Sequence, residues 1–386
     1  MNTYGTRPIT MTKGEGAYLW DQEGRRYLDA LTGIAVCGLG HCHPAVTAAV
    51  QEQAATLLHT SNLYNLPTQQ QAGDVLCEKA QMDKVFFSNS GAEANEAAIK
   101  LARLWGNQQG KATPTIVVME NAFHGRTMAT LTATGNPKAK QGFEPLLDGF
   151  VRVPFDDIEA VEKLATENAN ICAVLVEPVQ GEGGVHIPTA DYLPALRTLC
   201  DKHNWLLMLD EIQTGNGRTG EWFAWQHSGA KPDVMTTAKG LGNGMPIGAC
   251  LATGAAAELF QPGMHGSTYG GNPVACAAIS AVYQTLEDQN LVNRSAELGN
   301  RFQDGFEQQL ADSEAITNIR HQGLMIGIEL DRPCTELVNQ AAEKGFLINV
   351  TAGNVVRLLP PFILSDEQAD EIIESISQLI KDFVAA

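Results

Sequence analysis

Short, almost uninterrupted runs of apolar residues recur through the middle of the chain. They occur at 85–88, 115–119, 171–176, 205–209 and 233–237. Such runs are typical of strands that are covered on both faces of a sheet, because no face then has to be polar. Segments with helical patterning, such as 93–105 and 191–203, separate several of these runs. Strands that alternate with helices predict a mostly parallel, doubly wound sheet in a large α/β domain.

The two ends of the chain follow a different pattern. Residues 17–29 predict a small hairpin, with a turn at Asp21-Gln22-Glu23-Gly24. From about residue 275 the pattern changes to long helices, followed by strands near 323–330 and 346–358 and a last helix after Ser365. The spacing from Ser365 to Gln368 fits a capping box at the start of that helix.

These patterns predict two domains of unequal size. We expect residues 46–274 to form the large domain. Residues 1–45 and 275–386 should combine in a smaller α+β domain, with a ligand cleft between the two. In open parallel sheets, ligands bind beyond the carboxyl ends of the strands.

Composition and charge remove several classes of function. With 44% hydrophobic residues the chain is globular, and neither a membrane-spanning stretch nor a secretory signal is apparent, so we expect a cytoplasmic protein. The formal net charge of −18 disfavours nucleic acid and membranes as partners. The eight cysteines have no metal-ligand spacing, which favours reduced and mostly buried thiols and no metal site. The run Gly40-His41-Cys42-His43-Pro44 is interpreted as a turn, because adjacent side chains diverge.

The first candidate site follows the run at 85–88. There a strand ends and a helix begins, and Ser90 and Glu93 have the spacing of a capping box. Gly91 permits close approach of a ligand, and the free amides of a helix N-terminus bind anions such as phosphate. An ordinary capped helix explains this segment equally well.

Two charged residues close other apolar runs. Asp210 follows 205–209, and a buried acid at that place is costly without a cationic partner, either a protonated pyridine nitrogen or an ordinary Arg or Lys. Gln213, three residues on, is placed to contact the same ligand. Lys239 follows 233–237 among small residues, and a partly desolvated lysine loses pKa and becomes a nucleophile towards an aldehyde. A single lysine in a loop is more often a solvated surface group.

Two further segments have competing interpretations. Phe123 and Arg126 follow the run at 115–119 and are suited to stacking on a heterocycle and to binding a carboxylate. Taken singly, they are more often a core residue and a surface ion pair. Gly215-Asn216-Gly217-Arg218-Thr219-Gly220 matches the dinucleotide pattern GxGxxG, which keeps a nicotinamide-dependent dehydrogenase as an alternative. That interpretation is weak, because polar residues separate the strand from the glycines and no convincing helix start follows.

Taken together, these motifs resemble the class III pyridoxal-phosphate-dependent aminotransferases, which have the aspartate-aminotransferase fold (fold type I). The resemblance extends from Gly14 to the final helix and is most specific at 209–215, 237–240 and 266–273. It implies pyridoxal 5′-phosphate as the cofactor. It also implies a homodimer with shared active sites.

The resemblance implies roles for the residues around this cofactor. Lys239 would form a Schiff base with the cofactor aldehyde and move the proton, and Asp210 would pair with the pyridine nitrogen. Gln213 would contact the phenolic oxygen of the ring. The other implied cofactor contacts are stacking by Phe123, phosphate binding by the amides of Gly91 and Ala92, and a phosphate contact from Thr268 to the neighbouring subunit.

The resemblance also implies a set of substrate contacts. Arg126 would bind the substrate α-carboxylate, with Ser267 nearby and Tyr4 assisting. Glu182 and Arg357 would form a switch pair, which is neutral towards an ω-amine donor and opens when a dicarboxylate binds Arg357. Without the resemblance, Arg357 would be interpreted as a surface charge.

Within the class, the pattern is nearest to enzymes that act on acylated ornithine. Ile34 stands where ornithine aminotransferases have a tyrosine, which disfavours a donor with a free α-ammonium. The implied reaction converts N-acetylornithine and 2-oxoglutarate to N-acetylglutamate 5-semialdehyde and glutamate, a step of arginine biosynthesis. Succinylornithine, succinyl-diaminopimelate, ornithine and GABA remain alternative donors.

Overall fold

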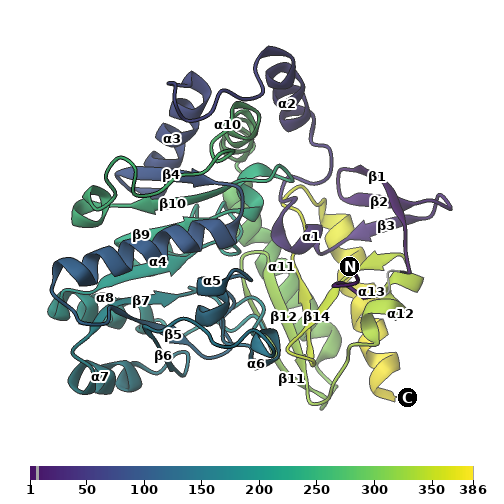
Figure 1. The fold of residues 1–386 in the computed structure, drawn as a ribbon. Helices are drawn as coiled ribbons and strands as arrows, with labels where there is room; N and C mark the ends of the chain where they lie inside the picture. Colours follow the sequence, from purple (N-terminus) through teal and green to yellow (C-terminus); the bar gives the residue numbers. More distant parts are fainter. Residues whose placement is uncertain (6–7, 386) are drawn as a thin grey trace.

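The computed structural model describes residues 1–5 and 8–385. Its centre is a seven-stranded sheet in the order β4-β10-β9-β8-β7-β5-β6 (Figure 1). Only β10 runs antiparallel to its neighbours, so the predicted mostly parallel sheet is confirmed. The strands are β4 (Lys84–Ser88), β5 (Thr115–Met119), β6 (Phe150–Val153), β7 (Ile171–Val176), β8 (Leu206–Asp210), β9 (Val234–Thr237) and β10 (Gly248–Ala252). Five of these match the apolar runs, whereas β6 and β10 were not predicted.

The inner strands are covered on both faces, as their composition predicts. Every residue of β5 and β7 is buried, and the long helix α4 (Gly91–Gln108) lies across one face of the sheet (Figure 1). Half of the residues that α4 buries are alanines, which lets it pack closely on the strands. The other elements of this region are α5 (Met128–Ala133), α6 (Pro137–Lys140), α7 (Ile158–Glu167), α8 (Tyr192–His203), α9 (Trp225–Ser228), η1 (Lys239–Gly242) and η2 (Gly254–Glu258).

The two ends of the chain meet in one sheet. β1 (Met11–Glu15), β2 (Tyr18–Asp21) and β3 (Arg26–Asp29) form an antiparallel meander that contains the predicted hairpin. β13 (Phe346–Leu347) adds to β3 in parallel, which joins the N-terminal segment to the C-terminal one. This pairing is the reason both termini lie on the same side of the molecule in Figure 1.

A second small sheet has the order β11-β12-β15-β14. It contains β12 (Met325–Leu330), β14 (Asn349–Thr351) and β15 (Val355–Leu358) within the predicted regions, and β11 (Ile316–Gln322), which was not predicted. The remaining helices are α1 (Thr32–Ala35), α2 (Pro44–Thr56), α3 (Pro67–Ala80), α10 (Pro273–Asp288), α11 (Leu291–Leu310), α12 (Leu337–Glu343) and α13 (Asp366–Ala385). α10 packs against α2 and α3, so it lies with the upper part of the large sheet in Figure 1. The domain boundaries after residues 45 and 274 stay predictions.

The two predicted capping boxes have different outcomes. At α13 both bonds form: the Gln368 amide donates to Ser365 Oγ (3.2 Å), and the Ser365 amide donates to Gln368 Oε1 (3.0 Å). At α4 the Glu93 amide donates to Ser90 Oγ (3.3 Å). The predicted reciprocal bond, from the Ser90 amide to the Glu93 side chain, is not formed, so this prediction is wrong in part. The Glu93 carboxylate accepts instead from the backbone and side-chain amides of Asn89, which offer two donors where Ser90 offers one.

Two further findings concern the described residues as a whole. Among them, no helix is both long enough and apolar enough to cross a membrane. Five of the eight cysteines are buried, as expected for most of them: Cys172, Cys200, Cys250, Cys276 and Cys334.

Candidate active site

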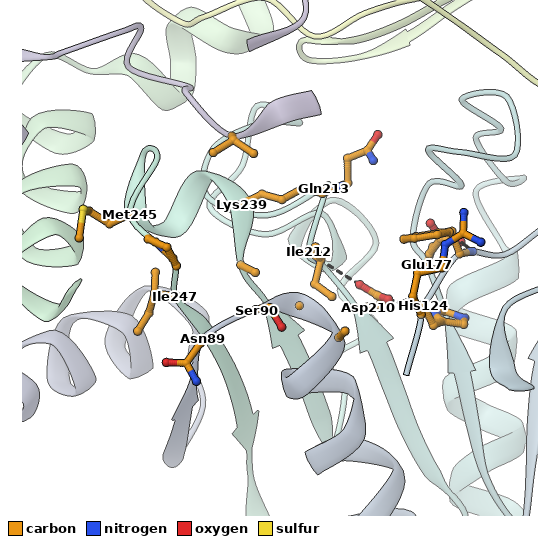
Figure 2. Close-up of a pocket in the computed structure, with 18 of the residues that line it drawn as sticks. Asn89, Ser90, His124, Glu177, Asp210, Ile212, Gln213, Lys239, Met245 and Ile247 are labelled. Carbon is orange, nitrogen blue, oxygen red and sulfur yellow. Dashed lines mark hydrogen bonds and ion pairs between the residues drawn. The ribbon is translucent and has the colours of Figure 1, made fainter. Parts of the chain in front are cut away.

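A cavity of about 390 Å³ lies beyond the carboxyl ends of the parallel strands (Figure 2). The strand ends and the N-terminus of α4 converge on it because parallel strands finish at one edge of their sheet. The lining includes Gly91, Phe123, Glu177, Asp210, Gln213 and Lys239. The structure therefore brings five predicted residues together at one cavity, and Glu177 is an addition.

Lys239 enters the cavity from the turn after β9. It is a non-glycine residue with a left-handed φ of 46°, a conformation that costs energy for a residue with a Cβ. Burial lowers the pKa of the Lys239 ammonium, and nearby Arg357 lowers it further, whereas the carboxylates of Glu182 and Asp210 oppose the shift. An amine that gives up its proton more readily is a better nucleophile.

Asp210 is held rigidly at the end of β8. Its side chain is almost fully buried, and Oδ2 accepts from Asn95 Nδ2 (2.8 Å) and lies 2.7 Å from His124 Nδ1. Oδ1 accepts from the Ile212 amide (3.1 Å), and Asn95 is itself fixed by Thr236 Oγ1 (2.7 Å). This network leaves the carboxylate little freedom, so it can pair with one cationic group of a ligand at a defined place.

His124 and Asn95 were not identified from the sequence. Asn95 lies on the buried face of α4, where the other buried residues are apolar or glycine, and a polar residue at such a position needs a partner. That signal was readable. His124 follows Phe123 in a loop, and only the folded chain shows that its ring points at Asp210.

Glu177 is a third carboxyl group in the wall, at the end of β7. It is 6% exposed, and its Oε2 accepts from the Phe123 amide (3.0 Å). Burial, reinforced by neighbouring Asp210, raises the pKa of Glu177 well above its usual value. Glu177 therefore tends to hold a proton, and it fixes the backbone of the aromatic residue Phe123. An acid at the end of a buried strand was the signal that identified Asp210, and it applied here as well.

The N-terminus of α4 forms another wall of the cavity. The first amides of a helix have no intrahelical acceptor and lie at the positive end of its dipole. Gly91 packs tightly there: a Cβ at this position would come within 2.6 Å of Ile212 Cδ1. A side chain therefore does not fit at position 91, and Gly91 and Ala92 both line the cavity.

These groups fit the phosphorylated, aldehyde-bearing pyridine that the sequence resemblance implies. Lys239 offers an amine for the aldehyde, Asp210 a carboxylate for the ring nitrogen and α4 a helix N-terminus for the phosphate. Phe123 provides an aromatic face beside them, with the Arg126 Cζ atom 5.5 Å from its ring centroid. Each of these residues lines the same cavity.

Glu182 and Arg357 form the ion pair that the resemblance implies. Arg357 Nη1 lies 2.7 Å from Glu182 Oε1 and 3.3 Å from Gln213 Oε1. Asn349 Oδ1 accepts from the other two nitrogens of the guanidinium (2.9 and 3.1 Å). Burial opposes ionisation of Glu182, but Arg357 holds the pKa of that carboxyl below its usual value. The alternative that Arg357 is a surface charge is wrong, because its side chain is fully buried.

Five predicted residues are not among those that line the cavity. Arg357 contacts the lining residue Gln213, and Glu182 pairs with Arg357 behind it. The other three are Ser267, Thr268 and Tyr4. Ser267 accepts a hydrogen bond from Asn89 Nδ2 (3.1 Å) at the edge of the site, and Thr268 is exposed beside it. Tyr4 is 80% exposed near the N-terminus. Their roles stay predictions, as does the role of Arg126, which is exposed but lines the cavity.

The other motifs take structural positions. Gly215–Gly220 forms consecutive turns after β8 and does not start a helix, unlike a dinucleotide fingerprint. His41 Nε2 lies 2.8 Å from Asp29 Oδ2 in the N-terminal segment. Within residues 1–5 and 8–385, no group of three or more His, Cys, Asp or Glu side chains is arranged to hold a metal ion.

Comparison with known proteins gives a consistent result. The family model for class III aminotransferases matches residues 2–380. The chain is 56% identical to an acetylornithine aminotransferase of Nitrosomonas europaea, over 100% of this chain and 98% of the relative. It is 50% identical to acetylornithine aminotransferase 1 of Bordetella pertussis, with the same coverage.

Solved structures agree with this. One is an ornithine aminotransferase of Toxoplasma gondii, with a TM-score of 0.95 and 34% sequence identity. The match covers 99% of this chain and 93% of that chain. In that structure pyridoxal phosphate is present at partial occupancy in the active site. Another is an acetylornithine aminotransferase of Elizabethkingia anophelis, with a TM-score of 0.88 and 35% sequence identity. The match covers 99% of this chain and 96% of that chain.

Proposed function

The chain belongs to the class III aminotransferases, and on this premise we propose that it transfers the terminal amino group of N-acetylornithine to 2-oxoglutarate. The products are N-acetylglutamate 5-semialdehyde and glutamate, which places the reaction in arginine biosynthesis. The single observation behind the chemistry is that Lys239 and Asp210, from neighbouring strand ends, face one cavity at the N-terminus of α4. The donor rests on full-length identity to acetylornithine aminotransferases.

We propose pyridoxal 5′-phosphate as the cofactor. When bound, it supplies a ring that accepts electrons from the substrate carbon next to the reacting amine. Asp210 would keep a proton on the ring nitrogen, and Gln213 would donate to the phenolic oxygen. Phe123 would stack on the ring, and the amides of Gly91 and Ala92 would hold the phosphate.

Lys239 performs the proton transfer. Its Nζ atom would also hold the cofactor. Its free amine would remove the proton from the carbon that bears the substrate nitrogen. Its lowered pKa supports this role, because the amine has to be unprotonated to act as a base.

The pair formed by Glu182 and Arg357 lets one site accept two kinds of substrate. Paired, the two side chains present little net charge to the amine end of N-acetylornithine. Glu182 is 34% exposed and can turn towards solvent, whereas Arg357 is fixed by Asn349 and cannot. When 2-oxoglutarate enters, Arg357 exchanges Glu182 for the carboxylate next to the reacting carbon, with a planar fork that suits it.

The outer part of the substrate is bound near the mouth of the cavity. Arg126 binds the α-carboxylate of the donor, with Ser267 and Tyr4 contributing. Ile34 provides an apolar surface in place of a polar contact. That surface favours an acylated nitrogen over a free ammonium, which distinguishes N-acetylornithine from ornithine.

We further propose a homodimer in which Thr268 contacts the cofactor phosphate of the partner subunit. Apolar side chains around this region are unusually exposed in a single chain: Leu58, Leu63, Tyr64 and Tyr269 have exposed fractions of 61%, 82%, 69% and 62%. Exposed apolar groups of this kind are typical of subunit interfaces. Light scattering across a dilution series measures the assembly, and Thr268→Ala should weaken cofactor retention without dissociating the dimer.

A donor panel is the decisive experiment. Purified enzyme is incubated with pyridoxal phosphate, 2-oxoglutarate and one of N-acetylornithine, succinylornithine, succinyl-diaminopimelate, ornithine or GABA, and glutamate formation is measured. We expect the highest kcat/KM with N-acetylornithine and no turnover by Lys239→Ala. A higher kcat/KM with another donor refutes the substrate assignment, and normal turnover by Lys239→Ala refutes the chemistry.

Two broader proposals accompany the function. We place the domain boundaries after residues 45 and 274, which limited proteolysis tests. We also propose a cytoplasmic location, which fractionation of the producing cells tests.

A further inference from the structure

We infer that Asn216 is a positioning residue for Lys239, an inference that rests on the proposed function of Lys239. Asn216 belongs to the glycine-rich segment Gly215–Gly220, which the proposed reaction does not otherwise use. It is 2% exposed, and its side chain points from this loop to the segment that leads into the lysine. Nothing in the proposed chemistry requires Asn216 to touch substrate or cofactor.

The backbone at Lys239 needs an external hold. Lys239 has a φ of 46°, and Ala238 before it has a φ of −166° and a ψ of −140°. Left-handed residues with a Cβ persist only where the surrounding structure fixes them. Without such contacts, the segment would relax and carry the Lys239 amine away from its place in the cavity.

The Asn216 side chain supplies this hold directly. Its Nδ2 atom donates to Thr237 Oγ1 (2.9 Å) and to the Ala238 carbonyl (3.2 Å), the two residues that precede Lys239. Its Oδ1 atom accepts from Tyr283 Oη (2.9 Å). The donors and acceptors of these three hydrogen bonds are all buried. A hydrogen bond is stronger there than in water, and an unsatisfied polar group is costly.

Tyr283 and the loop itself keep the amide in place. The Tyr283 ring stacks on Trp222 with a centroid distance of 5.3 Å and an interplanar angle of 8°. Asn216 has a φ of 58°, a conformation that asparagine tolerates better than most residues. On the other side of Lys239, Asn243 donates to the Gly40 carbonyl (3.1 Å) and accepts from the Leu39 amide (2.9 Å). The reactive segment is therefore held at both ends.

The test is Asn216→Gly, which removes the amide but keeps a residue that adopts φ of 58° without strain. The matched control is Asn204→Gly. Asn204 also has a left-handed φ, 56°, but it is exposed at the end of α8, before β8 begins and far from the carboxyl end where the cavity lies. Both changes replace asparagine by glycine and so have the same effect on the unfolded chain. A difference between the two variants therefore reports the loss of the Asn216 hydrogen bonds to Thr237 and Ala238.

Two measurements follow on cofactor-loaded protein. The first is the midpoint of the pH titration of the visible absorbance, which reports the environment of the bond at Lys239. It should shift by about half a pH unit or more in Asn216→Gly and stay unchanged in Asn204→Gly. The second is single-turnover kinetics, in which Asn216→Gly should slow both half-reactions about tenfold, with KM for 2-oxoglutarate altered less than about twofold.

Tyr283→Phe is the second variant. It keeps the ring on Trp222 and removes the donor to Asn216 Oδ1, so it should give a smaller shift of the same sign. It decides the matter if Asn216→Gly fails to accumulate as folded protein.

Three results overturn the inference. These are a wild-type titration and wild-type rates in the Asn216→Gly or Tyr283→Phe protein, equal changes in both glycine variants, or an effect confined to KM for one substrate. A wild-type protein that takes up no pyridoxal phosphate overturns the proposed function together with this inference. If the wild type takes up pyridoxal phosphate but the variants keep the wild-type titration and rates, only the inference about Asn216 is refuted.

Discussion

Glu182→Ala tests whether the contact with Arg357 sets the balance between the two substrates. Glu182 Oε1 lies 2.7 Å from Arg357 Nη1, and a hydrogen bond between charged groups contributes about 1.5–3 kcal/mol. Because the Glu182 side chain is 34% exposed, we take the lower end of that range. A dicarboxylate has to replace this contact before it binds. Since about 1.4 kcal/mol corresponds to a factor of ten, KM for 2-oxoglutarate should fall about tenfold in the variant.

The amine donor should respond in the opposite direction. With Glu182 removed, Arg357 is a buried cation that retains only the neutral partners Asn349 and Gln213. It repels the ammonium end of N-acetylornithine and attracts any carboxylate in its place. We therefore expect kcat/KM for the donor to fall about tenfold by the same arithmetic.

The assay is single-turnover kinetics of each half-reaction, with the cofactor absorbance as the signal. Glu182→Gln is the matched control, because it keeps a hydrogen-bond acceptor for Arg357 but removes the charge, and it should fall between the wild type and Glu182→Ala. If the ratio of kcat/KM for the two substrates stays at its wild-type value in Glu182→Ala, the pair does not control specificity. Loss of both half-reactions to the same extent would likewise contradict the reasoning.

Three further predictions concern buried groups. His124→Phe removes a partner of Asp210 2.7 Å away and should weaken cofactor binding about tenfold, measured by equilibrium dialysis. Glu177→Gln should change kcat less than about threefold, because the raised pKa of Glu177 means that the native side chain already tends to be neutral. His41→Gln tests pH dependence: burial opposes protonation, but the contacts with Asp29 and Cys37 prevail and raise the pKa of His41 from 6.5 to about 10. Protonated His41 should add to the free energy of unfolding by an amount on the order of 3 kcal/mol, after allowance for partial exposure. This contribution should be complete below pH 6.5 and lost as pH rises through about 10. Urea unfolding of the wild type and of His41→Gln across this pH range measures it.

The sequence predicted the buried strands of the large sheet because their composition leaves few alternatives. β7 is apolar throughout and β5 is apolar after Thr115, and such runs are typical of strands covered on both faces. β6 escaped prediction because it is short, lies at the sheet edge and contains Arg152. β10 escaped because Gly248–Ala252 consists mostly of small residues with little intrinsic preference for a strand. Its place between β9 and β4 is a tertiary effect.

The site shows the same division. Lys239 and Asp210 were found because charge at the end of an apolar strand is a local and costly feature. His124 was missed because its role depends on reaching Asp210, 86 positions further along the chain. For Arg357 the pattern alone gave the wrong environment. Its burial depends on Glu182 and Asn349, which lie in other segments, and no local pattern reports that.

The ion pair of Arg357 and Glu182, which adjoins the cavity through Gln213, explains how an acidic protein handles acidic substrates. The chain has a formal net charge of −18, so its long-range field repels a dicarboxylate. Beside the cavity, Arg357 is compensated by Glu182, whereas burial raises the pKa of Glu177 and so disfavours a second negative charge. The movable carboxylate of Glu182 therefore neutralises the fixed guanidinium of Arg357. Recognition of 2-oxoglutarate then requires only a local exchange at Arg357, and the positive charge appears when a carboxylate is present to take it.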